Sequence, residues 1–280
     1  MNSHFDPGAF QLFEQLGWER KAGAYHALYA PISGYVIDAL LDAAGVGPGL
    51  RVLDVGSGPG YVTARAAQRG AQVIGVDLAE AMVRLARQLH PGLYFDMGDA
   101  QVLAFPTGSF DAVVGNFALQ HLPHQLQALE GFVRVLVPGG RLAMTVWDEP
   151  TRCRFLGLFT DSVRLAGASP PPDLPAGPPM AASDGAYEDL LTTAGFQAPR
   201  IQTIAYHHHF TNADELWDGL LSASVRTAAL ITGQAPEVQA RIRAMFDGLI
   251  VDYATPEGLE IPISVKLLSA SRTGVTSAHS

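Results

Sequence analysis

The chain has 280 residues, 48% of them hydrophobic, and this length favours one α/β domain with a modest accessory element over two independent domains. Its formal net charge of −9 disfavours nucleic acid as a partner, and its single cysteine, Cys153, excludes an intramolecular disulfide and a multi-thiol metal site. Because the sequence has no long apolar run and residues 1–10 form neither a basic nor an apolar leader, we expect a cytoplasmic protein with no membrane partner.

Four segments follow one another along the chain. Residues 1–45 predict an N-terminal helical cap, and residues 46–150 alternate apolar strand-like runs with helical runs, as in a parallel sheet with crossover helices. Residues 151–270 are expected to hold a proline-rich connection at 170–179, lid helices and the final strands of the same domain. Residues 271–280 are expected to form a disordered tail.

Hydrophobic periodicity places the individual elements. In the core, strands are expected at 51–53, 73–76, 93–95, 112–114 and 141–146, with helices at 61–69 and 81–89. Beyond the proline-rich connection, the patterns predict helices at 186–193, 216–225 and 238–249 and strands at 201–206 and 259–267. The strict alternation of apolar residues in the last run is typical of a strand solvated on one face, and we expect it to be antiparallel.

A glycine-rich turn follows the first predicted strand, at Asp54-Val55-Gly56-Ser57-Gly58-Pro59-Gly60. Without Cβ atoms, its three glycines let backbone N–H groups approach a ligand closely. A dinucleotide fingerprint needs a further glycine where Tyr61 or Thr63 stands, so the pattern disfavours NAD. The remaining acid-x-Gly-x-Gly-x-Gly pattern, in which Asp54 can face an ammonium group, suits the amino-acid-bearing cofactor S-adenosylmethionine (SAM).

Five short segments carry a resemblance to a known family. They are residues 52–60, 75–77, 98–100, 110–113 and 136–140. In this order and spacing the chain resembles the class I SAM-dependent methyltransferases, in particular those of ubiquinone and menaquinone biosynthesis, from about residue 25 to residue 147. The resemblance implies a Rossmann-like, doubly wound sheet of seven strands with the last one antiparallel. Helical lid elements at the N-terminal and C-terminal ends would cover it.

The cofactor site follows from residue chemistry and from this resemblance. Asp77 stands at the end of the second strand, where a carboxylate can accept hydrogen bonds from both ribose hydroxyls. The resemblance implies that Asp99 accepts from the adenine amino group and that the Asn116 carbonyl holds the ammonium group. A helix cap for Asp99 and a core position for Met82 are alternatives. The expected cofactor residues are Asp54, Gly56, Ser57, Gly58, Gly60, Asp77, Leu78, Met82, Asp99, Ala100, Gln101 and Asn116.

The acceptor side is marked less clearly. Methyl transfer from a sulfonium is an in-line displacement, and a base matters only when the acceptor must lose a proton. His121, after the fourth core strand, is the candidate general base, with a structural histidine as the alternative. Trp18, Tyr25, Tyr29 and Trp147 are expected to bind the substrate, although aromatic residues at helical spacing can also simply pack in the core.

The sequence therefore predicts a SAM-dependent methyltransferase, a monomer or homodimer, that acts on oxygen, carbon or nitrogen of a small organic molecule, in bacterial secondary metabolism or quinone-like chemistry. The alternatives are a SAM-binding enzyme that catalyses a cyclisation or rearrangement, and a SAM-binding protein without catalysis. No metal is expected, because His207, His208 and His209 lack placed carboxylates and Asn116 supplies no acid to join Asp148.

Overall fold

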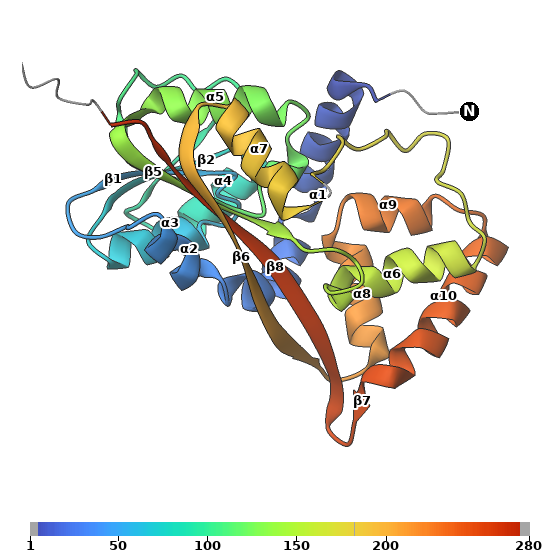
Figure 1. The fold of residues 1–280 in the computed structure, drawn as a ribbon. Helices are drawn as coiled ribbons and strands as arrows, with labels where there is room; N and C mark the ends of the chain where they lie inside the picture. The colour runs from blue at the N-terminus through green and yellow to red at the C-terminus, as the bar shows by residue number, and fades with distance from the viewer. Residues whose placement is uncertain (1–4, 182, 275–280) are drawn as a thin grey trace, which may run out of the picture.

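The computed structural model describes residues 5–181 and 183–274, and it consists of one mixed sheet with helices on both faces (Figure 1). The strands are β1 (Arg51–Val55), β2 (Gln72–Asp77), β3 (Tyr94–Met97), β4 (Phe110–Asn116), β5 (Leu136–Trp147), β6 (Phe196–Phe210), β7 (Ala254–Thr255) and β8 (Gly258–Arg272). The α-helices are α1 (Pro7–Gly34), α2 (Ile37–Ala43), α3 (Tyr61–Gln68), α4 (Glu80–Leu89), α5 (Gln125–Val135), α6 (Arg154–Leu165), α7 (Asp184–Thr193), α8 (Ala213–Ala223), α9 (Arg226–Thr232) and α10 (Pro236–Ile250).

The strand order is β3-β2-β1-β4-β5-β8-β6, and the two-residue β7 pairs with β8 outside this path. The first five strands are parallel to one another, whereas β8 runs antiparallel to both of its neighbours, β5 and β6. The expected α/β, Rossmann-like sheet of seven main strands with the last strand antiparallel is therefore confirmed. Since strand order reverses between β1 and β4, a crevice at the carboxyl ends of these strands is the natural ligand site.

Helices cover the two faces of the sheet with separate apolar cores. Side chains of α2 and α3 pack against β1 and β4 on one face, and α5 and α7 pack on the other. Val52 and Leu53 of β1 are fully buried, as expected of a strand enclosed by helices on both sides. The local sequence also sets where helices begin: the Asp6 side chain accepts hydrogen bonds from the N–H groups of Gly8 and Ala9 at the start of α1.

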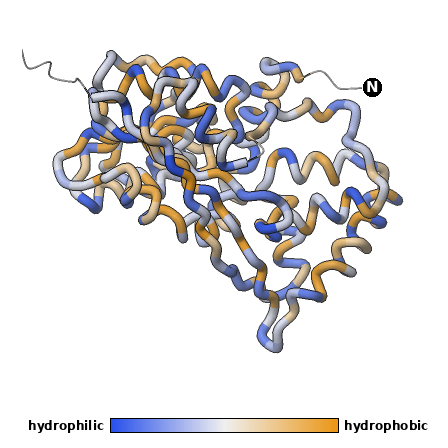
Figure 2. The backbone as a smooth tube through the Cα atoms, in the orientation of Figure 1, coloured by the Kyte–Doolittle hydropathy of each residue, from blue (hydrophilic) through white to orange (hydrophobic). Residues whose placement is uncertain are grey.

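A second group of helices, α6, α8, α9 and α10, packs beside the far ends of β6 and β8 (Figure 1). Apolar and polar residues alternate along these helices, so that each buries one stripe (Figure 2). The long α1 packs against both α4 and α8 and so connects this group to the sheet. Among residues 5–181 and 183–274, no helix combines the length and apolarity that crossing a bilayer requires.

Some expectations need correction. The runs 201–206 and 259–267 are parts of much longer strands, since β6 and β8 each have 15 residues. The expected tail begins too early, because Ser271 pairs with Arg141 of β5 and Arg272 pairs with Phe196 of β6. Residues 275–280 of that tail lie outside the described residues. Val225, expected at the end of a helix, lies between α8 and the short α9.

Candidate active site

A cavity of about 600 Å³ lies at the carboxyl ends of the parallel strands, in the size range of small-molecule sites. Its walls come from the glycine-rich turn, the ends of β2, β4 and β5, the length of α1, the loop after β4, residues 177–181 and 183–184, and the start of α9. Strand ends therefore form one side, and segments from both ends of the chain form the other.

The glycine-rich turn has left-handed backbone at Gly56, Gly58 and Gly60, with φ of 64°, 51° and 86°. Gly56 and Gly58 line the cavity. A Cβ atom on Gly56 would lie 2.7 Å from the Cβ of Ala118, so only glycine lets the turn approach the loop after β4 this closely.

Asp54, Ser57 and Gly60 do not line the cavity. Asp54 lies beneath the turn with 1% of its surface exposed, and its Oδ2 accepts a hydrogen bond from the Thr63 hydroxyl at 2.7 Å. Burial raises the pKa of Asp54 to about 7, partly opposed by the bond from Thr63. Gly60 precedes α3 and faces Phe95, whose ring would lie 2.6 Å from an added Cβ. Ser57 ties the turn to β2 through its N–H, which donates to the Val76 carbonyl at 3.0 Å. In this structure these three residues therefore support the turn and do not face the cavity.

Asp77 lies at the end of β2 in the cavity wall. Its Oδ2 accepts from the Gly58 N–H at 2.8 Å and its Oδ1 from the Ala79 N–H at 2.9 Å. Burial raises the pKa of the Asp77 carboxyl, and these two backbone bonds oppose the rise. Each oxygen keeps a further lone pair for a ligand hydroxyl, because a carboxylate offers about four acceptor sites.

Asp99 lies further along the same wall, with Leu78, Met82 and Ala100 also lining the cavity. Its Oδ1 accepts from the Gln101 N–H at 2.8 Å, and its Oδ2 accepts from the side-chain amide of Gln11 at 2.7 Å. Gln11 comes from α1, so the N-terminal helix contacts the acid expected to hold adenine. Met82 combines the two positions expected for it, because its side chain is buried in the core and also borders the cavity.

Asn116 ends β4, and its side chain is held in place on both sides. The amide nitrogen donates to the Ser33 carbonyl at 3.2 Å, and the amide oxygen accepts from the Thr145 hydroxyl at 2.5 Å. The next residue, Phe117, has a left-handed φ of 58°, which costs a non-glycine residue about 1–2 kcal/mol. Its ring stacks on Trp147 with centroids 3.9 Å apart, so the turn presents aromatic surface to the cavity.

Aromatic side chains of α1 form the opposite wall. Tyr25 stacks on Tyr29 with ring centroids 4.7 Å apart, and Trp18 meets Tyr25 edge to face with ring centroids 5.4 Å apart. All three line the cavity, and Tyr29 also contacts Trp147 at 6.3 Å. Burial raises the pKa of both tyrosines, so both stay neutral at physiological pH. These aromatic side chains therefore pack against one another and also line the cavity.

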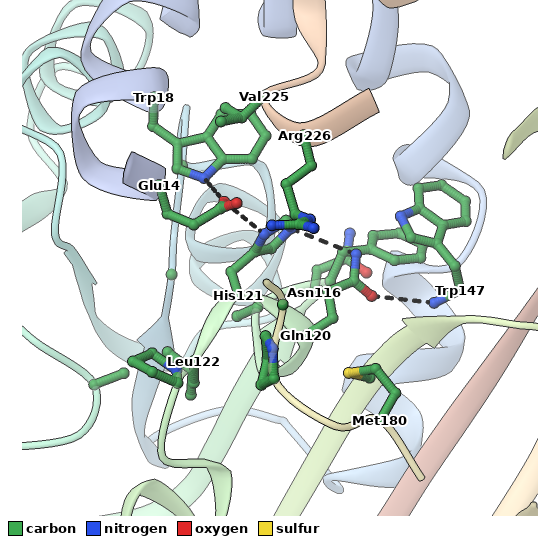
Figure 3. A pocket seen from close by; sticks show the side chains of 18 of the residues that line it. Glu14, Trp18, Asn116, Gln120, His121, Leu122, Trp147, Met180, Val225 and Arg226 are labelled. Carbon is green, nitrogen blue, oxygen red and sulfur yellow. Dashed lines mark hydrogen bonds and ion pairs between the residues drawn. The ribbon is translucent and has the colours of Figure 1, made fainter. Parts of the chain in front are cut away.

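His121 lies in the loop after β4 and belongs to a chain of hydrogen bonds (Figure 3). Its Nδ1 lies 2.9 Å from Glu14 Oε2, which also accepts from the Trp18 indole N–H at 3.0 Å. Its Nε2 lies 3.4 Å from the Gln120 amide nitrogen, while the Gln120 oxygen accepts from the Trp147 N–H at 3.3 Å. With Gln120 directed in this way, His121 Nε2 is an acceptor and Nδ1 carries the proton donated to Glu14.

The cavity also holds two basic side chains besides this histidine. Lys266 is neutralised locally, since its Nζ lies 3.0 Å from Asp184 and 3.7 Å from Asp148. Arg226, the first residue of α9, donates one hydrogen bond to the Pro175 carbonyl. Its guanidinium carbon lies 5.7 Å from the centre of the Phe10 ring.

The candidate metal-binding residues are used in other ways. Asp148 accepts from the Ser264 hydroxyl at 2.6 Å, and His209 Nδ1 lies 3.1 Å from Glu260 Oε1 on the neighbouring β8. In the part of the chain that the structure describes, no three histidine, cysteine, aspartate or glutamate side chains are grouped so as to hold a metal ion.

Comparison with known proteins places this architecture in a family. A family model described as "Methyltransferase domain" matches residues 53–144. Nocamycin O-methyltransferase of Saccharothrix syringae is 33% identical over 197 residues, which are 64% of this chain and 70% of that protein. The chain belongs to the class I SAM-dependent methyltransferases. The recognition made from the five sequence segments is thus confirmed.

Two further proteins show how far the similarity extends. Demethylmenaquinone methyltransferase of Renibacterium salmoninarum is 35% identical over 127 residues, 45% of this chain and 54% of that protein. The chain therefore spans only about half the length of this curated relative. The YcgJ protein of Bacillus subtilis superposes with a TM-score of 0.57 at 19% identity, over 86% of this chain and 99% of that one, and shares the fold.

The structure brings most of the expected site residues to one cavity. The expected residues that line it are Trp18, Tyr25, Tyr29, Gly56, Gly58, Asp77, Leu78, Met82, Asp99, Ala100, Gln101, Asn116, His121 and Trp147. The sequence analysis did not identify Gln11, Glu14, Gln120 or Arg226. The spacing of Glu14 four residues before Trp18 was an available signal, because residues i and i+4 share a helix face.

Proposed function

We propose that this chain binds SAM in the cavity and transfers its methyl group to a small organic acceptor. One observation carries the proposal: the carboxylates of Asp77 and Asp99 line the same cavity as His121 and the aromatic side chains of α1. The two carboxylates suit the ribose and adenine of the cofactor, and the aromatic side chains suit an organic acceptor. We retain Asp54, Ser57 and Gly60 as residues that shape the turn for the cofactor.

The chain would supply orientation above all. An in-line transfer needs nucleophile, methyl carbon and sulfur on one line, and such alignment can lower the barrier by about 7–11 kcal/mol. The stacked pairs Tyr25–Tyr29 and Phe117–Trp147 give flat, rigid walls for that purpose. Their apolar faces do not oppose a reaction in which the positive charge of the sulfonium disperses. Residues 1–45 would act as the cap that excludes water.

His121 is proposed as the general base for an acceptor that must lose a proton. Its Nδ1–H donates to Glu14, which is 3% exposed, so the basic lone pair is on Nε2, where the Gln120 amide approaches at 3.4 Å and an acceptor would take its place. When Nε2 takes a proton, the buried Glu14 carboxylate stabilises the resulting imidazolium. Glu14 is accordingly a positioning residue, with the same role as a carboxylate that orients a catalytic histidine.

The test has two parts. Calorimetry should show binding of SAM and S-adenosylhomocysteine but not of NAD, and incubation of SAM with small phenols, acids and amines should release S-adenosylhomocysteine. Formation of a rearranged product without S-adenosylhomocysteine would favour the cyclisation alternative instead. NAD binding without SAM binding would refute the proposal outright.

The role of His121 is tested by the His121→Gln variant. For an acceptor with a neutral O–H or N–H nucleophile, we expect turnover to fall by roughly 10²- to 10⁴-fold with unchanged SAM affinity. His124→Gln is the matched control, because His124 is exposed and does not line the cavity. Full activity of the His121 variant would indicate that this residue has only a structural role.

The expectation of a monomer or homodimer is checked by light scattering of the same preparation.

A further inference from the structure

Arg226 is a charged cavity-lining residue that the proposed reaction does not use. Its side chain is half-buried and points into the cavity that also holds Glu14 and His121 (Figure 3). The guanidinium lies over the Phe10 ring and donates to the Pro175 carbonyl through Nη1. A guanidinium has five N–H donors in a fixed planar fork, so most of its capacity is unused in this arrangement.

No carboxylate among the described residues lies within the 4.0 Å ion-pair distance of Arg226. The other long basic side chain in the cavity, Lys266, forms ion pairs with Asp184 and Asp148. Burial lowers the pKa of Arg226, and the Glu14 carboxylate opposes this effect from a longer distance. A guanidinium remains charged under all physiological conditions, so Arg226 is a half-buried cation without a direct counter-ion among the described residues.

Hydrogen bonds already engage three of the acids that line the cavity. Glu14 Oε2 accepts from both His121 and Trp18, while its buried Oε1 has no hydrogen-bond partner among the described residues, and Asp77 accepts from two backbone N–H groups. Asp99 accepts from Gln11 and Gln101. A half-buried cation gains most from a ligand that brings its own negative charge, because unpaired charges are costly away from water.

We propose that Arg226 binds a carboxylate of the methyl acceptor, and that the acceptors of this chain are small, flat organic acids. The inference rests on the proposed function and adds the class of the substrate. A carboxylate matches the planar guanidinium fork through two parallel hydrogen bonds. The aromatic faces of Trp18 and Trp147 in the same cavity suit a flat ring on that carboxylate.

The experiment measures ligand binding rather than turnover. Protein saturated with S-adenosylhomocysteine is titrated with benzoate and 2-naphthoate, and with the neutral amides of the same rings, by calorimetry. We expect the wild type to bind the carboxylates more tightly than the amides. Arg226→Gln should weaken carboxylate binding by about 10- to 100-fold and leave amide and S-adenosylhomocysteine binding unchanged. Arg226→Lys should lose less, because it keeps the charge without the fork.

Arg241→Gln is the matched control, because it changes the net charge equally at an exposed position of α10 that does not line the cavity. It should leave all affinities unchanged. Three results would overturn the inference: no saturable binding of either carboxylate at millimolar concentrations, equal losses for carboxylates and amides in Arg226→Gln, or a loss confined to S-adenosylhomocysteine. The last result would mean that Arg226 serves the carboxylate of the cofactor. A wild type that binds no S-adenosylhomocysteine would instead refute the proposed function itself, and this inference with it.

Discussion

The buried carboxyl of Asp54 should make the protein less stable as the pH rises towards neutrality. Burial raises the pKa of Asp54 from 3.8 to about 7, so the folded chain holds this proton more tightly than the unfolded chain does. The contribution of Asp54 to stability is therefore complete below about pH 4 and is lost as the pH rises through about 7. A shift of roughly 3 units at 1.36 kcal/mol per unit corresponds to about 4 kcal/mol.

Asp54→Asn removes this titration while leaving an oxygen that can accept from Thr63. The new amide nitrogen takes the place of Oδ1, which has no partner, and this costs about 1–3 kcal/mol at every pH. The informative quantity is thus the change with pH. Relative to the wild type, the variant should gain about 4 kcal/mol of unfolding free energy between about pH 4 and pH 8.

Urea unfolding followed by tryptophan fluorescence at several pH values measures this difference. Asp38→Asn is the control: hydrogen bonds from Arg65 and Arg69 lower the pKa of Asp38, so this exposed carboxyl stays ionised from about pH 5 to pH 8 in both states. Its effect should not vary over that range. A constant difference between wild type and Asp54→Asn across the same range would refute the argument that Asp54 is buried without adequate partners.

Three further predictions test the site and its support, and the last of them compares two glycine substitutions. Asp77→Asn should weaken S-adenosylhomocysteine binding by about 10- to 100-fold in calorimetry, because one ribose hydroxyl then loses a charged acceptor; unchanged affinity in the folded variant would contradict this role. Glu14→Gln should lower kcat by about 10- to 100-fold and move its pH profile while the affinity for SAM is kept, and equal losses in both would indicate a merely structural role. Gly60→Ala should destabilise the fold by about 2–4 kcal/mol in urea, since its Cβ meets Phe95, whereas Gly58→Ala, with open space at its Cβ, should cost only about 1–2 kcal/mol; equal costs would be evidence against close packing.

The cofactor half of the molecule was predictable because its signals are local. A parallel strand covered on both faces is a continuous apolar run, and Val52 and Leu53 show this burial. The turn that follows needs positive φ at three positions, and glycine reveals such positions directly. Asp77 is placed by the end of its strand alone. Sequence therefore sufficed for β1, β2, β4 and the turn between β1 and α3.

The helical group was harder to predict because its order depends on tertiary contacts. Helix α6 packs on α10 and β8, which follow it by about 80 to 100 positions in the chain, and α9 has only seven residues, which are too few for a clear periodic pattern. The length of β6 was also hidden, since its edge position leaves many residues partly exposed and weakens the apolar pattern. The disagreement over Ser271 has the same origin: pairing with β5 extends β8 past the end of its apolar alternation.

The cofactor side of the cavity could be predicted from local sequence patterns, whereas the acceptor side could not. This difference bears on substrate specificity. Glu14 contacts His121 across 107 positions of sequence, and Gln11 contacts Asp99 across 88, so no local pattern could reveal either pair. The family model ends at residue 144, and both Glu14 and Arg226 lie outside it. Residues that would hold a shared cofactor fall within the part common to relatives, and so does His121, whereas the other residues that would face the acceptor include side chains of α1 and α9 outside it. Because Arg226 adds a half-buried charge there, a relative without that cation would leave a carboxylate unpaired at the same place, which disfavours an acidic acceptor far more than a lost apolar contact would. Similarity over the cofactor half is therefore compatible with a different acceptor in each relative.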